Sequence, residues 1–260
     1  MPGSAISHIS PGDGDSPGYK RRRGLSPNPV PRRKGTAVKT AILLCAFVVL
    51  QLSPVAASAQ DPVKVDPGHY KVVLDNATVR VLRVDLPAGG KTPMQQHPET
   101  LVIPLVTSKS RFTRPDGKSE DVDLASESAT FMPAGSHSGT NSDAGRTEAI
   151  VIEFKAAAPG KAALPTSRPG MAMKSLADSS RGAAYRVTAD ASFNEPAGST
   201  HDYDQVVIAL GAAQVSLAID RKPAKTTWAR GDVVFIGRGV PHEAKNTGGK
   251  AADLLIVAIK

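Results

Sequence analysis

The chain has few of the residue types that carry covalent, redox or nucleotide chemistry. Cys45 is the only cysteine among 260 residues, which excludes a disulfide within the chain and any CxxC motif. No phosphate-binding loop and no nucleophile elbow occurs, so nucleotide-binding enzymes, serine hydrolases and thiol redox proteins gain no support. Stability must therefore come from the burial of apolar side chains, for which about 200 residues are enough.

Long apolar runs are also missing. The run Ala41–Leu50 is shorter than the about 20 residues that a membrane span needs. Eight Lys and Arg residues and two Asp residues precede it, and Ala57-Ser58-Ala59 follows with the form of a signal-peptidase site. We therefore expect residues 1–59 to be a cleaved signal peptide, which would place the protein in the periplasm or outside the cell without a stable membrane anchor. A retained anchor is the alternative.

The excess of positive charge belongs mostly to this leader. The whole sequence has a formal net charge of +8, but eight of its 32 basic and two of its 24 acidic residues lie in the first 59. The remaining 24 basic and 22 acidic residues leave a net charge of about +2. The sequence therefore predicts no nucleic acid and no anionic membrane as a partner.

After residue 61 the chain consists of short segments rich in β-branched residues, separated by Gly, Pro, Asp or Asn. Examples are Tyr70–Leu74, Val79–Val84, Glu148–Phe154, Tyr185–Thr188 and Leu254–Ile259. Pro115–Lys118 contains an Asp-Gly hairpin signal, and Asp220-Arg221 takes the matching place later in the chain. No helical period exceeds a turn or two outside the leader. This spacing predicts an all-β, double-sheet jelly roll.

The chain is a duplication with an offset of about 105 residues. Each copy has a histidine beside an apolar run, a second histidine 40 or 41 residues later in a glycine turn, and an asparagine four residues after that. These residues are His97, His137 and Asn141 in the first copy, and His201, His242 and Asn246 in the second. A fixed period predicts repeated domains. We expect them at residues 60–155 and 185–260, joined by a linker at residues 156–184.

This pattern resembles the cupin superfamily, and two copies in one chain resemble a bicupin. Cupins carry a first motif with His-x-His and a later Glu, and a second motif of the form Pro-x-Gly-x-x-His-x-x-x-Asn. The first copy has Pro133, Gly135, His137 and Asn141, with one residue fewer before the histidine. The second copy has Gly237, Gly239, His242 and Asn246, with Gly237 in place of the motif proline. The resemblance implies two tandem double-stranded β-helix barrels.

In the family, three imidazoles and one carboxylate from these motifs surround a divalent metal. The resemblance places the four positions at Gln95, His97, Leu101 and His137 in the first copy, and at Ser199, His201, Gln205 and His242 in the second. Each copy therefore keeps two imidazoles and lacks the carboxylate. Because an amide or hydroxyl oxygen is a weaker metal ligand than a carboxylate, reduced metal sites are expected.

Glu99 offers another carboxylate in the first copy. It follows His97 by two residues, so strand alternation would place both side chains on one face. His97, Glu99 and His137 would then form the two-histidine, one-carboxylate set of non-haem iron oxygenases. The alternative is a solvated Glu99 at the barrel mouth, because Pro98 can turn the strand.

Polar side chains near the histidines can also bind a ligand without metal. In the second copy Tyr203 and Gln205 share a face with His201, and Ser199 lies just before it. Gln95 has the corresponding place in the first copy. The alternative is a polar cluster that binds nothing.

We therefore expect an exported bicupin with reduced metal sites, which binds a small polar molecule in its barrel. The alternative is a metal-dependent cupin enzyme of the dioxygenase or isomerase type that uses a two-histidine site, so enzymatic activity stays open. The cofactor is expected to be either absent or a divalent ion of iron, manganese, nickel or zinc. The expected partner is a small-molecule ligand, and a homodimer or larger assembly through barrel edges is a third idea.

Overall fold

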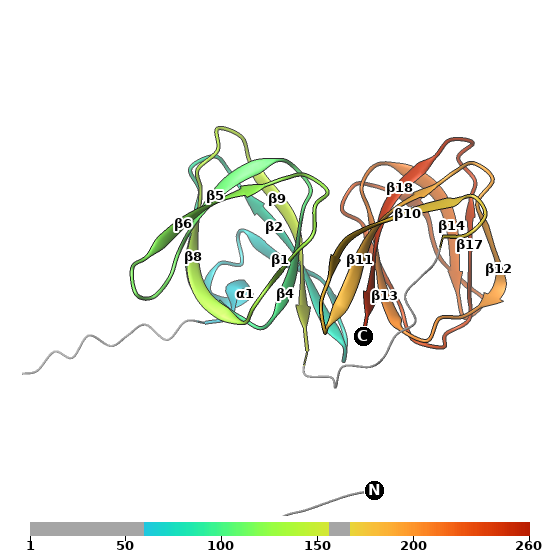
Figure 1. The fold of residues 1–260 in the computed structure, drawn as a ribbon, viewed down its shortest axis with the longest axis horizontal. Coiled ribbons are helices and arrows are strands. Elements are labelled where there is room, and N and C mark those ends of the chain that lie inside the picture. The colour runs from blue at the N-terminus through green and yellow to red at the C-terminus, as the bar shows by residue number, and fades with distance from the viewer. Residues whose placement is uncertain (1–59, 156–166) are drawn as a thin grey trace, which may run out of the picture. The chain divides into compact units, whose positions relative to one another are not determined.

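The computed structural model describes residues 60–155 and 167–260, and each of these two parts closes into a barrel (Figure 1). The predicted signal peptide lies outside the described residues, as does much of the predicted linker. Within the described ranges, no helix is long and apolar enough to cross a membrane.

The first barrel contains one short helix and nine strands. They are α1 (Pro62–Val65), β1 (Tyr70–Asp75), β2 (Val79–Leu86), β3 (Lys91–His97), β4 (Thr100–Pro104), β5 (Ser108–Thr113), β6 (Ser119–Leu124), β7 (Thr130–Met132), β8 (Gly135–Asn141) and β9 (Thr147–Phe154). One sheet has the order β1-β2-β9-β4-β7, and the facing sheet has the order β3-β8-β5-β6. Each pairing is antiparallel, from β1 with β2 to β5 with β8.

The second barrel repeats this arrangement. Its strands are β10 (Met171–Asp178), β11 (Gly182–Ala189), β12 (Asn194–Ser199), β13 (Asp204–Ala209), β14 (Ala213–Ile219), β15 (Lys222–Trp228), β16 (Val233–Ile236), β17 (His242–Asn246) and β18 (Ala252–Ile259). The sheet orders β10-β11-β18-β13-β16 and β12-β17-β14-β15 equal those of the first barrel with nine added to each label. The prediction of two tandem jelly-roll barrels is confirmed.

The second domain begins earlier than the sequence predicted. Strand β10 lies inside the segment 156–184 that composition assigned to a linker, and it pairs with β11 from Met171 opposite Ala189 to Asp178 opposite Ala183. It is an edge strand with one neighbour, and its side chains are exposed or only half-buried. Such a strand needs no regular apolar alternation, so composition alone did not reveal it.

The inner strands of the two five-stranded sheets are largely buried on both faces. In β9, Ile150 and Ile152 belong to one apolar cluster with Ile208 and Val257 of the second barrel. The alternate residue Val151 packs inside the first barrel. Strands covered on both sides have continuous apolar sequences instead of alternating ones. This cluster joins the barrels, since burial of apolar area is the dominant stabilising contribution.

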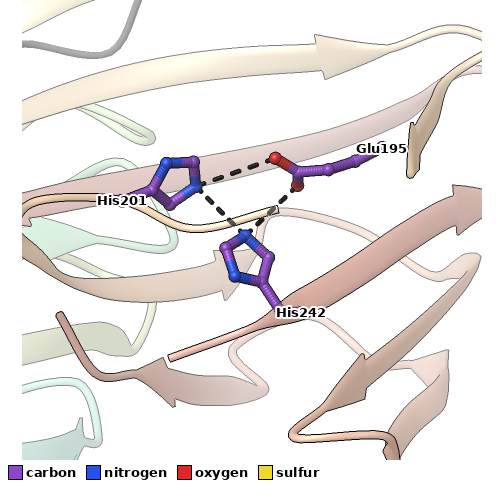
Figure 2. A group of neighbouring side chains, drawn as sticks. All are labelled: Glu195, His201 and His242. Carbon is purple, nitrogen blue, oxygen red and sulfur yellow. Dashed lines mark hydrogen bonds and ion pairs between the residues drawn. The ribbon is translucent and has the colours of Figure 1, made fainter. Parts of the chain in front are cut away.

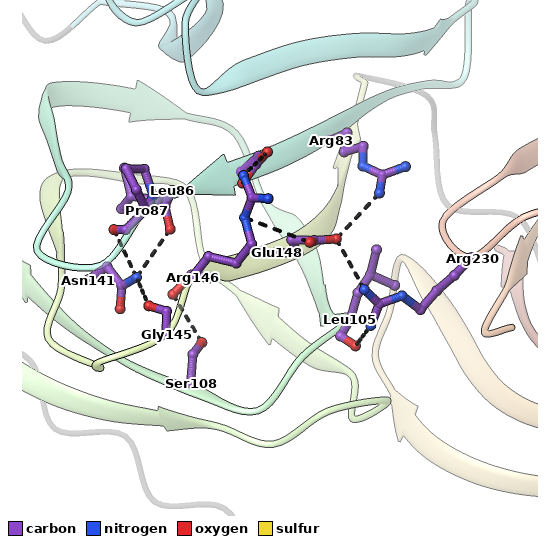
Figure 3. Close-up of polar contacts among 12 residues, drawn as sticks. Arg83, Leu86, Pro87, Leu105, Ser108, Asn141, Gly145, Arg146, Glu148 and Arg230 are labelled. Carbon is purple, nitrogen blue, oxygen red and sulfur yellow. Dashed lines mark hydrogen bonds and ion pairs between the residues drawn. The ribbon is translucent and has the colours of Figure 1, made fainter.

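Polar contacts surround this apolar interface. Glu148 Oε2 lies 3.3 Å from Arg83 Nη2 and 3.5 Å from Arg230 Nη2, and Arg230 also donates to the carbonyl of Leu105 at 3.0 Å (Figure 3). Arg186 of the second barrel pairs with Glu127 of the first at 2.6 Å. Such partly exposed pairs contribute at most about 1 kcal/mol each, so they orient the interface more than they stabilise it.

The repeated asparagine of each copy ties the motif turn to the rest of its barrel. Asn141 Nδ2 donates to the carbonyls of Leu86, Pro87 and Gly145 at 3.1, 3.0 and 2.8 Å (Figure 3). Asn246 Nδ2 donates in the same way to Ala189, Asp190 and Lys250 at 3.1, 2.9 and 2.7 Å. Both side chains are buried, and each Oδ1 accepts a backbone N–H two residues on. Their role is structural.

Candidate functional site

A carboxylate and two imidazoles converge inside the second barrel. Glu195, His201 and His242 offer ligand atoms that all lie within 4.8 Å of one another (Figure 2). His242 Nε2 is 3.1 Å from His201 Nε2 and 3.5 Å from a Glu195 oxygen, and His201 Nε2 is 3.8 Å from the other oxygen. Among the residues that the structure describes, this is the one such group of three. Two histidines and a carboxylate form a set that binds divalent transition metals.

Local backbone geometry brings Glu195 to the histidines. It lies on β12, which pairs with β17 at Glu195 opposite Ala244 and at Ser199 opposite His242. The register shifts between these pairs, and Gly198 has a φ of 85° there. In this irregular stretch Ser199 donates to the carbonyl of Pro196 at 2.8 Å. Ser199 is not among the residues that line the cavity beside the histidines, and its role in ligand binding stays a prediction.

Hydrogen bonds orient His242 for a metal. Its Nδ1 lies 3.0 Å from the carbonyl of Val240, so Nδ1 carries the proton and Nε2 presents its lone pair to Glu195 and His201. His201 lies in the loop before β13, and its carbonyl accepts from the N–H of Gly239 at 2.7 Å. That glycine has a φ of 69°, which fits the glycine turn predicted for the motif.

Besides Glu195, the sequence analysis also missed Arg168 at this site. Its Nη1 pairs with Glu195 Oε1, and its Nη2 donates to His201 Nδ1 at 3.2 Å. A donor on Nδ1 places the His201 proton on Nε2, where it points at His242. The guanidinium therefore opposes metal binding twice, because it neutralises the carboxylate and favours the wrong tautomer of one imidazole.

The surroundings keep His201 neutral. Burial lowers its pKa to about 4, with further lowering by the nearby His242 and Arg168. The ring of Tyr203 stacks on it at 5.0 Å with an angle of 5° between planes, and burial raises the pKa of this tyrosine to about 12. Tyr203 and Gln205 line a cavity of about 30 Å³ beside Glu195, His201 and Arg168. The structure thus brings these two predicted ligand-binding residues to the site.

Removal of the guanidinium is expected to strengthen metal binding. Arg168→Gln removes the positive charge beside Glu195 and replaces the guanidinium donor to His201 Nδ1 with a weaker amide donor. The dissociation constant for Zn²⁺ should therefore fall by about tenfold or more. Competition with a fluorescent chelator measures this. Arg186→Gln, which removes a guanidinium far from the site, is the control and should change nothing. Equal or weaker zinc binding by Arg168→Gln would mean that Arg168 instead supports the site.

The first barrel has the histidine pair without a carboxylate. His97 Nε2 is 3.3 Å from His137 Nδ1, and His97 Nδ1 lies 2.7 Å from the carbonyl of Pro98. The register places Thr92 opposite Gly139, where β12 and β17 place Glu195 opposite Ala244. Thr92 Oγ1 accepts from the N–H of Gly139 at 2.8 Å. The position equivalent to Glu195 therefore holds a hydroxyl group.

Glu99 does not complete that pair. It lies between the end of β3 and the start of β4, where the chain passes from one sheet to the other, so strand alternation does not carry across Pro98. No described group of three metal-binding side chains contains it. Leu101, the position at which the family has its carboxylate, is fully buried in the interface between the barrels. The predicted set of His97, Glu99 and His137 is thus not brought together.

The buried histidines predict acid sensitivity of the metal-free protein. Burial lowers the pKa of His137 to about 4, with His97 adding to this, and His201 has a similar value. The ordinary pKa of both histidines is 6.5. Between pH 6.5 and pH 4 the unfolded chain therefore binds more protons than the folded chain. The free energy of unfolding should then fall as the pH drops from about 6.5 towards 4. Urea unfolding with a chelator, at pH 7 and pH 5, should show a smaller difference for His137→Gln than for the parent. An unchanged difference would refute this assignment.

Comparisons with known proteins support the fold. No protein-family model and no curated protein matches the sequence. AerE from Microcystis aeruginosa is 14% identical, with a TM-score of 0.57 over 78% of this chain and 97% of that one. A salicylate 1,2-dioxygenase from Pseudaminobacter salicylatoxidans is 11% identical, with a TM-score of 0.52 over 70% and 71%. A cupin domain from Bordetella pertussis Tohama I is 28% identical over 34% of this chain and 92% of its own, with a TM-score of 0.32.

The matches to AerE and to the dioxygenase each cover at least 70% of this chain at low identity, so they establish architecture and not chemistry. The chain therefore has a tandem two-barrel fold of the cupin type, which is the architecture that the sequence predicted.

Proposed function

We propose that this bicupin binds one divalent transition-metal ion in its second barrel, on Glu195, His201 and His242. The observation that carries the proposal is the convergence of one carboxylate and two imidazoles on a single point. All three side chains are nearly buried, with Glu195 7% and His242 2% exposed. A buried carboxylate beside two imidazoles gains more from a cation than an exposed acidic cluster does.

The donor set favours iron, zinc, manganese or nickel over calcium and magnesium. Imidazole nitrogen is a good ligand for the first group, whereas the second prefers oxygen ligands alone. Three protein ligands leave coordination positions open, and a metal there would polarise a bound oxygen ligand. The chain's own residues would then hold and orient that ligand: Tyr203 offers a hydroxyl group that stays protonated, and Gln205 offers an amide.

The cavity beside the site limits what can reach it. With Arg168 in place it holds about 30 Å³, which is room for water or a very small ligand. Arg168 pairs with Glu195 Oε1, so its guanidinium lies beside any metal or ligand bound there. A small polar ligand bound at the metal fits this arrangement best. Turnover of such a ligand, as in a metal-dependent cupin enzyme, is the second candidate, favoured by the open positions.

Metal content tests the proposal. The mature protein, purified without a histidine tag and dialysed against buffer, should contain about one equivalent of transition metal per chain or take it up from solution, as expected for three protein ligands. Inductively coupled plasma mass spectrometry measures the first case, and calorimetric titration with Fe²⁺, Mn²⁺, Ni²⁺ and Zn²⁺ measures the second. A chain that contains no metal and takes up none of the four would refute the proposal.

Export belongs to the same proposal. The leader-like composition of residues 1–59 supports it, because such a leader predicts a periplasmic or secreted protein. Mass spectrometry of the N-terminal peptide of the protein from its natural source tests it. A mature chain that starts at or near Gln60 supports export, and an intact leader contradicts it.

A further inference from the structure

A second cavity lies inside the first barrel, below the His97–His137 pair. Its volume is about 90 Å³, and its wall is largely apolar. Leu82, Val84, Phe112 and Val151 are among the side chains that form it. This is room for several waters or for one small organic molecule. The second barrel has only about 30 Å³ at the corresponding histidines.

Two buried polar groups in this wall have atoms without a protein partner. Gln95 is 4% exposed, its Nε2 donates to Tyr70 Oη at 2.7 Å, and its Oε1 has no hydrogen bond. Glu153 is 2% exposed, and its Oε1 likewise accepts no hydrogen bond in the described part of the chain. Both residues line the cavity. An unsatisfied buried acceptor costs about 1–3 kcal/mol, so both are expected to meet a hydrogen-bond donor.

The charge around Glu153 decides which donors fit. Arg80 pairs with Glu153 Oε2 and, at 2.6 Å, with Asp61, so two carboxylates share one guanidinium. A carboxylate at this position accepts hydrogen bonds and donates none, and the two carboxylates beside one guanidinium repel anions. Gln95 has one free amide end whichever way its amide is turned. A ligand must therefore bring a donor to Glu153 and a second polar hydrogen to Gln95.

We propose that the first barrel is a metal-free binding site for a small apolar molecule that carries two hydroxyl groups. The apolar body fills the space among the aliphatic side chains and Phe112, and the hydroxyl groups donate to Gln95 Oε1 and Glu153 Oε1. Carboxylates are excluded by the charge of Glu153. No metal takes part, because Thr92 holds the place that Glu195 holds in the other barrel. The two barrels have diverged, one towards metal and one towards an uncharged organic ligand.

An outer cavity borders the inner one. A larger outer cavity of about 600 Å³ shares His97, Phe112, Met132 and His137 with the inner one. Arg114, Glu120 and Asp123 line the outer cavity. The imidazole of His137 is neutral, since burial holds its pKa near 4, so His137 adds no charge where the two cavities meet.

Resorcinol, a six-membered apolar ring with two hydroxyl groups, tests the proposal. Ligand-observed NMR and calorimetry with the mature protein should show resorcinol binding at least about tenfold more tightly than benzene, as expected for two added hydrogen bonds of modest net strength. Benzoate should not bind. A chelator should leave the resorcinol affinity unchanged, which separates this site from the proposed metal site. Failure of the metal proposal would therefore not affect the outcome.

Substitutions locate the site. Gln95→Leu should weaken resorcinol binding about tenfold while benzene binding stays the same or improves, because only a polar contact is lost. Gln96→Leu makes the same change one residue on, at an exposed side chain of the same strand, and should alter neither. Thermal unfolding checks that both variants fold. The proposal is overturned if resorcinol does not bind, if benzene binds as tightly, if benzoate binds better, or if Gln96→Leu has the larger effect.

Discussion

Replacing Glu195 with glutamine is expected to remove the metal from the second barrel. The amide keeps the size of the side chain but loses the negative charge and one strong oxygen donor, so two imidazoles alone face the cation. Loss of an outer-shell partner already costs about 10–100-fold in metal affinity, and loss of this direct ligand should cost more. Calorimetric titration with Zn²⁺ should therefore show no binding at concentrations that saturate the parent. His201→Ala and His242→Ala should have the same effect.

The first barrel supplies the control for this experiment. His137→Ala removes an equally buried imidazole from a pair that lacks the carboxylate, and it should leave the metal content near one equivalent per chain, as one intact three-ligand site predicts. If His137→Ala lost the metal and Glu195→Gln kept it, the metal would be bound in the first barrel, and its proposed place in the second barrel would be wrong. Comparable losses in both variants would mean that metal uptake depends on folding and not on the ligand set.

A second large effect is expected at Asn246. Asn246→Asp replaces an amide that donates to three backbone carbonyls with a carboxylate that repels them, at a side chain 4% exposed. Several buried carbonyls lose their donor at once, so the free energy of unfolding should fall by about 3 kcal/mol or more. Urea unfolding measures this difference. Asn141→Asp should behave alike, because its contacts are equivalent.

Asn194→Asp is the matched control. Asn194 is exposed on β12, so the same change in chemistry there should alter stability by no more than about 0.5 kcal/mol. A similar loss of stability in Asn194→Asp and Asn246→Asp would show that added negative charge, and not the buried network, destabilises the protein.

The carboxylate beside the second histidine pair was not recognised from the sequence. The family pattern places a glutamate after the histidine, and the chain has Leu101 and Gln205 there, so both copies were expected to lack one. The structure supplies Glu195 from before His201. The signal was present, since Glu195 is the only acidic residue between Asp190 and His201, but the pairing of β12 with β17 was needed to recognise it.

The sequence placed Glu99 beside His97 and His137, and the structure does not, for a related reason. Alternation of side chains holds within one strand, and the strand ends at His97. The prediction from sequence therefore continued a periodicity across a point where the chain changes sheets. Arg168 could not be anticipated at all, because it comes from a segment assigned to the linker and reaches the site only through the packing of the second barrel.

The sequence alone determined the repeated all-β architecture and the two histidine pairs, because strand alternation and a motif repeated at a constant offset are properties of the chain order. Only the tertiary structure decided which barrel has a carboxylate beside its histidines and that Arg168 pairs with it. It also decided that Gln95 and Glu153 line a cavity and that each has one oxygen without a hydrogen bond in the described part of the chain. Those features depend on strand register, one β-bulge and the packing of sheets far apart in sequence, and no local pattern encodes them.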